Sequence, residues 1–317
     1  MTVIDAQELS KAYTDGFKKR SILALDAVTF SVTQGEIFGL LGPNGAGKTT
    51  FMKVALGIVQ ATSGRINITG RRPSDPRSRR KVGYLPENHR FPIHLTGLGL
   101  LQFTGRQYGL SASEISDRTD LLLPMVGMDK WGETKIRKYS KGMQQRIGLA
   151  QALMPDPDVL MLDEPTDGVD PVGKVEIRTV LERIRGEGKS IVLNSHLLAE
   201  VESVADRVAI LSRGHIVRIA SIDDLTQRQC QFKIRAEIGN RLVEVPEEVG
   251  RILSLSSGGL VVELVDDDKI NFVIDELRMK KIAIRSVEPL KVSLEQSFIE
   301  AITQPVADDG DGEKAES

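Results

Sequence analysis

The segment 42–49 has the residue types of a loop that binds phosphate. It reads GPNGAGKT and fits the pattern G-x-x-x-x-G-K-[ST], whose glycines let backbone N–H groups turn inward around phosphate oxygens. In this pattern the Lys48 ammonium reaches the β- and γ-phosphates, and the Thr49 hydroxyl binds Mg²⁺. The pattern therefore predicts a site for a nucleoside triphosphate. The residues expected to bind the nucleotide here are Gly42, Pro43, Asn44, Gly45, Ala46, Gly47, Lys48, Thr49 and Thr50.

Two carboxylates follow a short apolar run farther along the chain. Asp163 and Glu164 come directly after VLML at 159–162, and acids at the carboxyl end of a parallel strand lie at the ligand-binding edge of a sheet. We expect Asp163 to hold Mg²⁺ through water and Glu164 to orient or deprotonate an attacking water. Glu164 and Lys48 are therefore candidate catalytic residues. The alternative, an exposed acidic turn after a core strand, is disfavoured because the chain also has a phosphate loop.

The phosphate loop needs a strand before it and a helix after it, and the sequence provides both. Residues 37–41 form a continuous apolar run typical of a strand buried on both faces. A helical pattern starts at Thr49, so the helix N-terminus adds a positive dipole end beside the phosphates. Residues 4–9 and 27–32 are expected to form an antiparallel edge. Further strands at 65–68, 82–85, 159–162, 191–194 and 208–211, several separated by helical patterns, predict a mostly parallel α/β sheet.

The rest of the chain divides by composition and pattern. Residues 96–150 read as an inserted helical subdomain, with Thr96 and Ser111 as helix N-caps. The character changes near 221–229, which predicts an ATPase domain over 1–220 and a small α+β domain over 221–304. Residues 305–317 are acidic and nearly free of apolar groups, so we expect them to be disordered.

A third motif narrows the class of nucleotide-binding protein. Residues 139–144 read YSKGMQ and resemble the L-S-G-G-Q signature of ABC ATPases, with Tyr139 and Lys141 as departures. Residues 164–170 resemble the D-loop of that family, and 193–196 resemble its switch strand with a histidine. The resemblance covers about residues 4–220 and implies a P-loop NTPase core of ABC-cassette type, with an antiparallel β edge and a helical subdomain. A small C-terminal α+β domain follows this core.

The resemblance also implies roles for individual residues. His196 would contact the γ-phosphate and the catalytic water, and Asp170 would help to join two subunits. Glu87 stands in the position of the Q-loop glutamine, where a carboxylate can still bind Mg²⁺ and link the site to a permease. Tyr13 matches the aromatic residue that stacks on adenine, with Phe17 as its rival. The signature residues expected to contact ATP are Ser140, Gly142 and Gln144.

The family resemblance implies partners as well. One chain has one phosphate loop and one signature, so a second cassette is expected to complete each ATP site, most simply in a homodimer. A multi-span membrane permease would be a separate polypeptide. Residues 293–299 are similar to the tail of cassettes from export-type systems. These features predict a cytoplasmic protein, peripheral on the cytoplasmic face of the cell membrane, that uses ATP and Mg²⁺ to drive export.

Composition limits the other possibilities. A net charge of −2 over 317 residues gives no overall attraction for nucleic acid, so no nucleic-acid partner is expected. No apolar run approaches the roughly 18 residues of a membrane-spanning helix, and the N-terminus shows no secretion signal. The single cysteine, Cys230, excludes an intramolecular disulfide and is expected to be a core residue. A soluble ABC ATPase acting on nucleic acid or ribosomes remains the alternative function.

Overall fold

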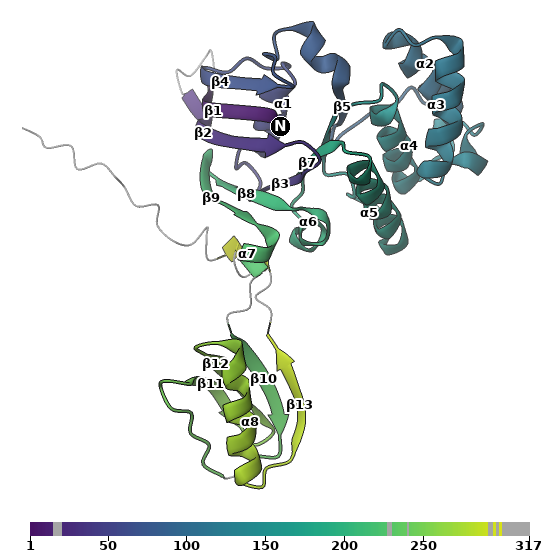
Figure 1. Cartoon of the computed structure of the whole chain (residues 1–317). Coiled ribbons are helices and arrows are strands. Elements are labelled where there is room, and N and C mark those ends of the chain that lie inside the picture. The colour runs from purple at the N-terminus through teal and green to yellow at the C-terminus, as the bar shows by residue number, and fades with distance from the viewer. Residues whose placement is uncertain (15–20, 227–229, 240, 291–293, 296–297, 300–317) are drawn as a thin grey trace, which may run out of the picture. The chain divides into compact units, whose positions relative to one another are not determined.

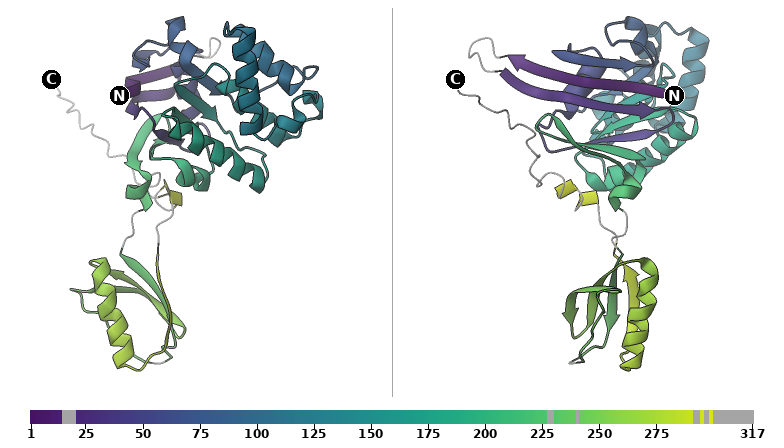
Figure 2. Two further views of the ribbon diagram at one scale, coloured as in Figure 1. Left: turned by 45° about the vertical axis from the view of Figure 1, so that its right-hand side comes forward. Right: turned by 60° about the vertical axis from the view of Figure 1, so that its left-hand side comes forward.

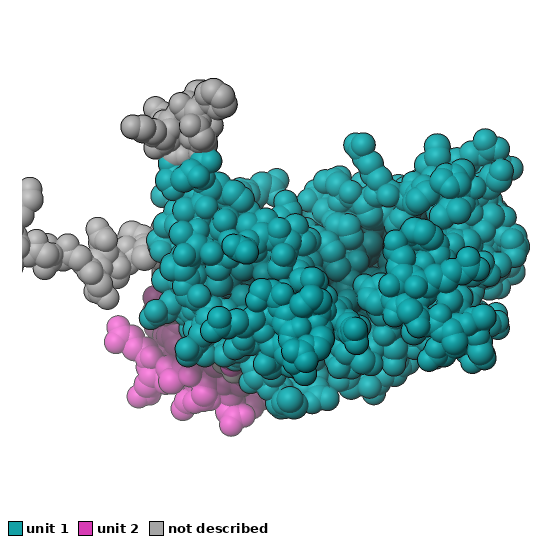
Figure 3. Space-filling view, turned by 90° about the horizontal axis from the view of Figure 1, so that it is seen from above, with its two compact units in different colours: residues 1–222, 301–317 teal, residues 223–300 magenta. Residues whose placement is uncertain are grey.

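The computed structural model describes residues 1–299, apart from 15–20, 227–229, 240, 291–293, 296 and 297. The expected tail at 305–317 and the rival adenine-stacking residue Phe17 lie outside these described residues. By its contacts the chain forms two compact units, 1–222 and 223–300 (Figure 1; Figure 3). Each unit is described by itself.

A six-stranded sheet is the centre of the first unit. Its strand order is β5-β6-β7-β3-β8-β9, and all neighbouring strands are parallel except β8 and β9. Every residue of β3, β6 and β7 is buried, as expected for parallel strands covered on both faces. The predicted parallel α/β sheet is confirmed. The strands are β3 Ile37–Leu41, β5 Val82–Leu85, β6 Val159–Asp163, β7 Ser190–Asn194, β8 Arg207–Ser212 and β9 His215–Ser221.

A second sheet is antiparallel and has the order β2-β1-β4. Its strands are β1 Thr2–Thr14, β2 Ser21–Thr33 and β4 Ser63–Ile68. The assignment of 65–68 to the parallel sheet was therefore wrong, since β4 pairs antiparallel with β1. The physical reason is visible in β4 itself, where buried Ile66 and Ile68 flank half-buried Asn67. This alternation suits a sheet that is covered on one face only.

The two sheets share one hydrophobic core with the helix that follows the phosphate loop, α1 Lys48–Ala55. Phe30 of β2 stacks on Phe38 of β3 with 5.0 Å between ring centroids. Phe51 of α1 lies 4.7 Å from Phe30, measured in the same way. The core therefore fixes α1 against both sheets. It thereby also fixes the N-terminus of α1, which directly follows the phosphate loop.

Three helices form a subdomain on the side away from β1 and β2 (Figure 2). They are α2 Gly97–Gln107, α3 Ala112–Met125 and α4 Lys141–Leu153. The expected caps are present, because Thr96 Oγ1 accepts from Gly99 N at 2.9 Å and Ser111 forms a capping box with Glu114. The remaining helices of this part of the chain are α5 Pro171–Gly186, α6 Leu198–Val204 and α7 Ile222–Thr226, with short 3-10 turns at Pro76–Lys81, Asp129–Trp131 and Ile136–Lys138.

The described part of the second unit contains a four-stranded antiparallel sheet and the helix α8 that packs with it. The strand order is β11-β12-β10-β13. Strand β11 was not expected, because five of its seven residues are exposed and it lacks a continuous apolar face. Cys230 is half-buried at the margin of this unit's core, not within it as expected. The elements are β10 Gln231–Ala236, β11 Gly250–Ser256, β12 Gly259–Leu264, the 3-10 turn Asp267–Lys269, α8 Ile270–Met279 and β13 Ile284–Pro289.

Candidate nucleotide-binding and hydrolysis site

A cleft of about 420 Å³ opens where the central parallel strands end. It brings together the loop before α1, the segment after β5, and the residues after β6 and β7, as expected for ligands of open α/β sheets. Of the residues predicted from sequence, residues 44–50 of the phosphate loop, Glu87, Glu164 and His196 meet here, whereas Gly42, Pro43 and Asp163 do not line the cleft. The lining residues are Ala24, Asn44, Gly45, Ala46, Gly47, Lys48, Thr49, Thr50, Glu87, Glu164, Asp167, Asn194 and His196.

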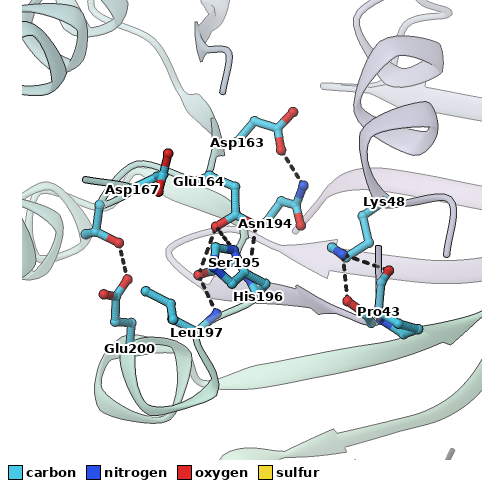
Figure 4. A network of polar contacts seen from close by, with 12 residues as sticks. Pro43, Lys48, Asp163, Glu164, Asp167, Asn194, Ser195, His196, Leu197 and Glu200 are labelled. Atoms are coloured by element: carbon cyan, nitrogen blue, oxygen red, sulfur yellow. Dashed lines mark hydrogen bonds and ion pairs between the residues drawn. The ribbon is translucent and has the colours of Figure 1, made fainter. Parts of the chain in front are cut away.

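The phosphate loop has the backbone that only glycine adopts without strain. Gly47, immediately before α1, has φ 110°, and a Cβ there would lie 2.4 Å from the carbonyl oxygen of Ala24. The loop curls around Lys48, whose Nζ donates to the carbonyl oxygens of Gly42 at 2.6 Å and Pro43 at 3.2 Å (Figure 4). Burial lowers the pKa of Lys48, and the nearby Glu164, Asp163 and Glu87 oppose this shift. A buried ammonium at the start of a helix is suited to binding a polyanion.

Asp163 is a buried carboxylate at the end of β6, with 1% of its surface exposed. Burial raises the pKa of Asp163, hydrogen bonds from Asn194 and Thr49 lower it, and the neighbouring charges of Glu87 and Glu164 raise it further. A divalent cation beside Asp163 and Thr49 would relieve this crowding of negative charge. Mg²⁺ usually binds one or two carboxylates together with waters and phosphate oxygens. The residues present therefore fit Mg²⁺, although no group of three His, Cys, Asp or Glu ligands occurs in the part of the chain described.

The backbone of Glu164 is held in an uncommon conformation. Its φ is 52°, in the left-handed region that costs a non-glycine residue about 1–2 kcal/mol. Three hydrogen bonds hold it there: Glu164 N donates to Asn194 O at 2.8 Å, and Glu164 O accepts from Gln145 Nε2 and from Asp167 N, each at 3.2 Å. Such strain is kept where the surrounding structure over-determines it, commonly at functional sites.

The carboxylate of Glu164 contacts the residues that follow β7. It accepts from the backbone N of His196 at 2.9 Å and from Ser195 Oγ at 3.3 Å, and its Oε2 lies 2.8 Å from His196 Nδ1 (Figure 4). A general base must be held within hydrogen-bond reach of its proton donor. These contacts hold the side chains of Glu164 and His196 together in the cleft that the phosphate loop also lines.

Asn194 and Gln145 also belong to this site, although neither was predicted to have a role in it. Asn194 ends β7 beside Asp163, to which its Nδ2 donates, and its Oδ1 is buried with no hydrogen-bond partner among the described residues. Gln145, buried at 1% exposure, supports the Glu164 carbonyl. For Asn194 a signal existed, because a polar residue ends an otherwise apolar strand there, as Asp163 does in β6.

The signature residues lie apart from the cleft of their own chain. Ser140 is the N-cap of α4, where its Oγ accepts from Met143 N at 3.3 Å. Neither Ser140 nor Gly142 nor Gln144 is among the residues that line the cleft. Lys141, the departure from the family pattern, makes an ion pair of 2.6 Å between its Nζ and Asp167 Oδ2. The signature helix is thereby linked to the loop that follows Glu164.

Two other predicted residues have local roles in the structure. Asp170 is the N-cap of α5, with Oδ1 accepting from Gly173 N at 2.8 Å. Tyr13 lies at the end of β1, is 39% exposed and has Lys11 Nζ 5.1 Å from its ring centroid. It is not among the cleft-lining residues, which include Ala24 of the neighbouring β2. The subunit-joining role of Asp170 and adenine stacking by Tyr13 both stay predictions.

Replacement of Tyr13 by Ala tests the stacking role. A stacked base contributes about 1–3 kcal/mol, so we expect the dissociation constant for ATP to rise roughly 5- to 150-fold. Titration with a fluorescent ATP analogue would measure the change, and Tyr13→Phe, which keeps a ring, is the matched control. An unchanged constant for Tyr13→Ala, with weaker binding by Phe17→Ala, would transfer the role to Phe17.

Several known proteins are similar to this chain in sequence or in fold. The sequence profile of the ABC transporter family matches residues 25–167. An uncharacterized ABC transporter ATP-binding protein of Synechocystis sp. is 36% identical over 306 residues, 95% of this chain and 85% of that protein. A lantibiotic transport ATP-binding protein of Streptococcus pyogenes is 37% identical over 215 residues, 68% of this chain and 89% of that protein. A solved ATP binding subunit of an ABC transporter aligns with a TM-score of 0.63 and 30% identity, covering 70% of this chain and 91% of that chain.

Proposed function

The chain belongs to the ATP-binding proteins of ABC transporters and is an ATPase of that family, and from this premise we propose that it drives export of a substrate through a separate multi-span permease. The observation that carries the proposal is the cleft in which the phosphate loop, Glu164 and His196 meet. A role in transport is supported by the similarity to a lantibiotic transport ATP-binding protein. In this proposal the chain is peripheral on the cytoplasmic face of the membrane. Within the described residues, no helix combines the length and apolar character of a membrane span.

Each residue of the cleft has a part in the proposed reaction. The phosphate loop and Lys48 hold the triphosphate by backbone N–H groups and one ammonium. Thr49 and Asp163 would hold Mg²⁺, which supplies charge neutralisation at the β- and γ-oxygens when it is bound. Glu164 accepts a proton from the attacking water, and His196, bonded to Glu164, keeps the carboxylate directed at that water. Glu87, which lines the cleft, links the metal site to the permease in this proposal.

We further propose that two cassettes pair head to tail, with two ATP molecules between them. This arrangement is supported by the position of Ser140, which is exposed at the start of α4 but does not line the cleft of its own chain. A helix N-terminus with a serine hydroxyl beside it suits the binding of an anion. In the pair, Ser140 of each chain completes the site built by Lys48, Asp163 and Glu164 of the other. Two-fold symmetry then makes both sites equivalent in a homodimer.

Co-expression with a candidate permease, a multi-span membrane protein from a reading frame adjacent to this chain's gene, tests the transport proposal. We expect the chain to sediment with membranes when that multi-span protein is present and to stay in the supernatant when it is absent. Co-expression with an unrelated multi-span protein of similar abundance is the control for non-specific sedimentation. Ribonuclease-sensitive sedimentation with ribosomes, independent of any membrane protein, would instead support the alternative action on nucleic acid or ribosomes.

A further inference from the structure

A carboxylate outside the cleft connects the two loops that carry Glu164 and His196. Glu200 lies on α6, four residues after His196, and its side chain is 20% exposed. Its Oε2 accepts a short hydrogen bond from the Thr166 hydroxyl, and Thr166 lies two residues after Glu164. Its Oε1 lies 2.7 Å from Lys174 Nζ of α5. Glu200 therefore joins α6 to α5 and to the loop after β6.

These contacts close a ring that starts and ends at Glu164. The Glu164 carboxylate accepts from Ser195 Oγ at 3.3 Å, and Ser195 Oγ in turn accepts from Leu197 N at 3.0 Å (Figure 4). Leu197 O then accepts from Glu200 N at 3.0 Å. The Glu200 carboxylate accepts from the Thr166 hydroxyl, and the backbone through Pro165 connects Thr166 to Glu164. Neighbouring residues in the ring are joined by hydrogen bonds or peptide bonds, so the ring restrains the loop of Glu164 in addition to the direct contacts of its carboxylate with His196.

The ring has little freedom to relax if one link is removed. Thr166 is 7% exposed, and a buried hydroxyl that loses its partner keeps the full cost of desolvation. A mostly apolar cavity of about 240 Å³ lies beside the link, lined in part by Pro165, Leu181 and Leu193, with Lys174, Arg178 and Ser203 as polar members of the lining. The strained backbone of Glu164, with φ 52°, is held by the same loop.

We propose that Glu200 is a positioning residue for hydrolysis: through Thr166 it holds the loop that carries Glu164, without touching ATP itself. The proposal rests on the ATPase activity of the family and not on export or on a permease. Misplacement of a catalytic group by about 1 Å can reduce turnover by roughly 100-fold. Loss of the link should therefore lower kcat and leave ATP binding by the phosphate loop nearly unchanged.

Steady-state ATPase kinetics of the purified full chain test this proposal. We expect Glu200→Ala to lower kcat at least tenfold, with KM for ATP changed less than twofold. Thr166→Val, which keeps the shape but removes the hydroxyl, should give a similar fall. The double variant should be no slower than the slower single variant, because both changes break one link. Glu200→Gln keeps an acceptor oxygen for Thr166, so it should recover most of the activity lost in Glu200→Ala.

Two controls separate positioning from general destabilisation. Glu182→Ala removes a carboxylate of an exposed ion pair with Arg178 on α5, outside the ring, and should leave kcat unchanged. Thermal unfolding of each variant shows whether the fold survives, and Thr166→Val remains informative if Glu200→Ala does not fold. Wild-type kcat in Thr166→Val, or additive losses in the double variant, would overturn the proposal. Failure of membrane sedimentation would refute the transport proposal alone, since these kinetics require no permease.

Discussion

Replacement of Glu164 by Gln is expected to stop hydrolysis while leaving ATP binding intact. Glutamine keeps the size of the side chain and can still accept from His196 N, but it cannot take a proton from water. Loss of a general base lowers turnover by about 100- to 10,000-fold. In the proposed head-to-tail pair, ATP then remains uncleaved between two chains, so the dimer accumulates. Phosphate release measures the first effect, and size exclusion at saturating Mg-ATP measures the second.

The matched control is Glu182→Gln, the same chemical change at an exposed ion pair of α5. This variant should hydrolyse ATP, and its dimer should stay in equilibrium with the monomer. Two observations together would contradict the composite site for the isolated subunit. One is a Glu164→Gln chain that remains monomeric at saturating Mg-ATP and micromolar concentration. The other is a wild-type rate strictly linear in enzyme concentration, since a dimeric site requires a steeper dependence.

Mixing two inactive variants should restore activity. Lys48→Ala removes the ammonium proposed to contact the phosphates, and Ser140→Arg blocks the start of α4, so under the proposal each variant alone builds two damaged sites. In a mixed dimer one composite site carries both changes and the other carries neither. Random pairing makes about half of the dimers mixed, so we expect up to roughly a quarter of wild-type activity if the two sites act independently.

The measurement is ATPase rate against the ratio of the two variants at constant total protein, with a maximum expected near equal amounts. Mixing Lys48→Ala with Glu164→Gln is the control, because both changes damage the same half of the site and no intact site forms in any dimer. Recovery in that control would show that the site is not built as proposed. Absence of recovery with Ser140→Arg at every ratio would show that Ser140 does not act across an interface.

The parts of the site that could be predicted from sequence are those whose structure is determined by residues close together in the chain. A glycine loop between an apolar strand and a helix is recognisable because all its parts lie within about a dozen residues, 37–49. Asp163 and Glu164 follow a fully apolar strand, and the carboxyl ends of parallel strands meet at one edge. The apolar run before Asp163 and Glu164 predicts that both residues lie at this edge of the sheet. The parallel pairing of β6 with β7 agrees with that prediction.

The remainder depends on contacts between distant segments. Thr166 and Glu200 are 34 positions apart, and no spacing rule connects them. Gln145 supports Glu164 from another helix, again without a sequence pattern. The assignment of β4 failed for a related reason, because which sheet a short strand joins is decided by its pairing partner, here β1. Strand β11 was not predicted because hydrophobic periodicity identifies strands with a buried face, and most residues of β11 are exposed.

The C-terminal unit has a consequence for how proteins of this kind diversify. The members of its hydrophobic core lie between Phe232 and Ile282, so this unit buries its apolar groups against its own residues. An alignment that covers 68% of this chain is long enough to contain a cassette without such an addition, whereas one that covers 95% extends into it. A segment with a self-contained core carries the basis of its own folding when it is joined to a gene or exchanged between genes. Recombination at this boundary thus offers a route to new regulation or partner choice that keeps the sequence of the ATP-hydrolysing unit.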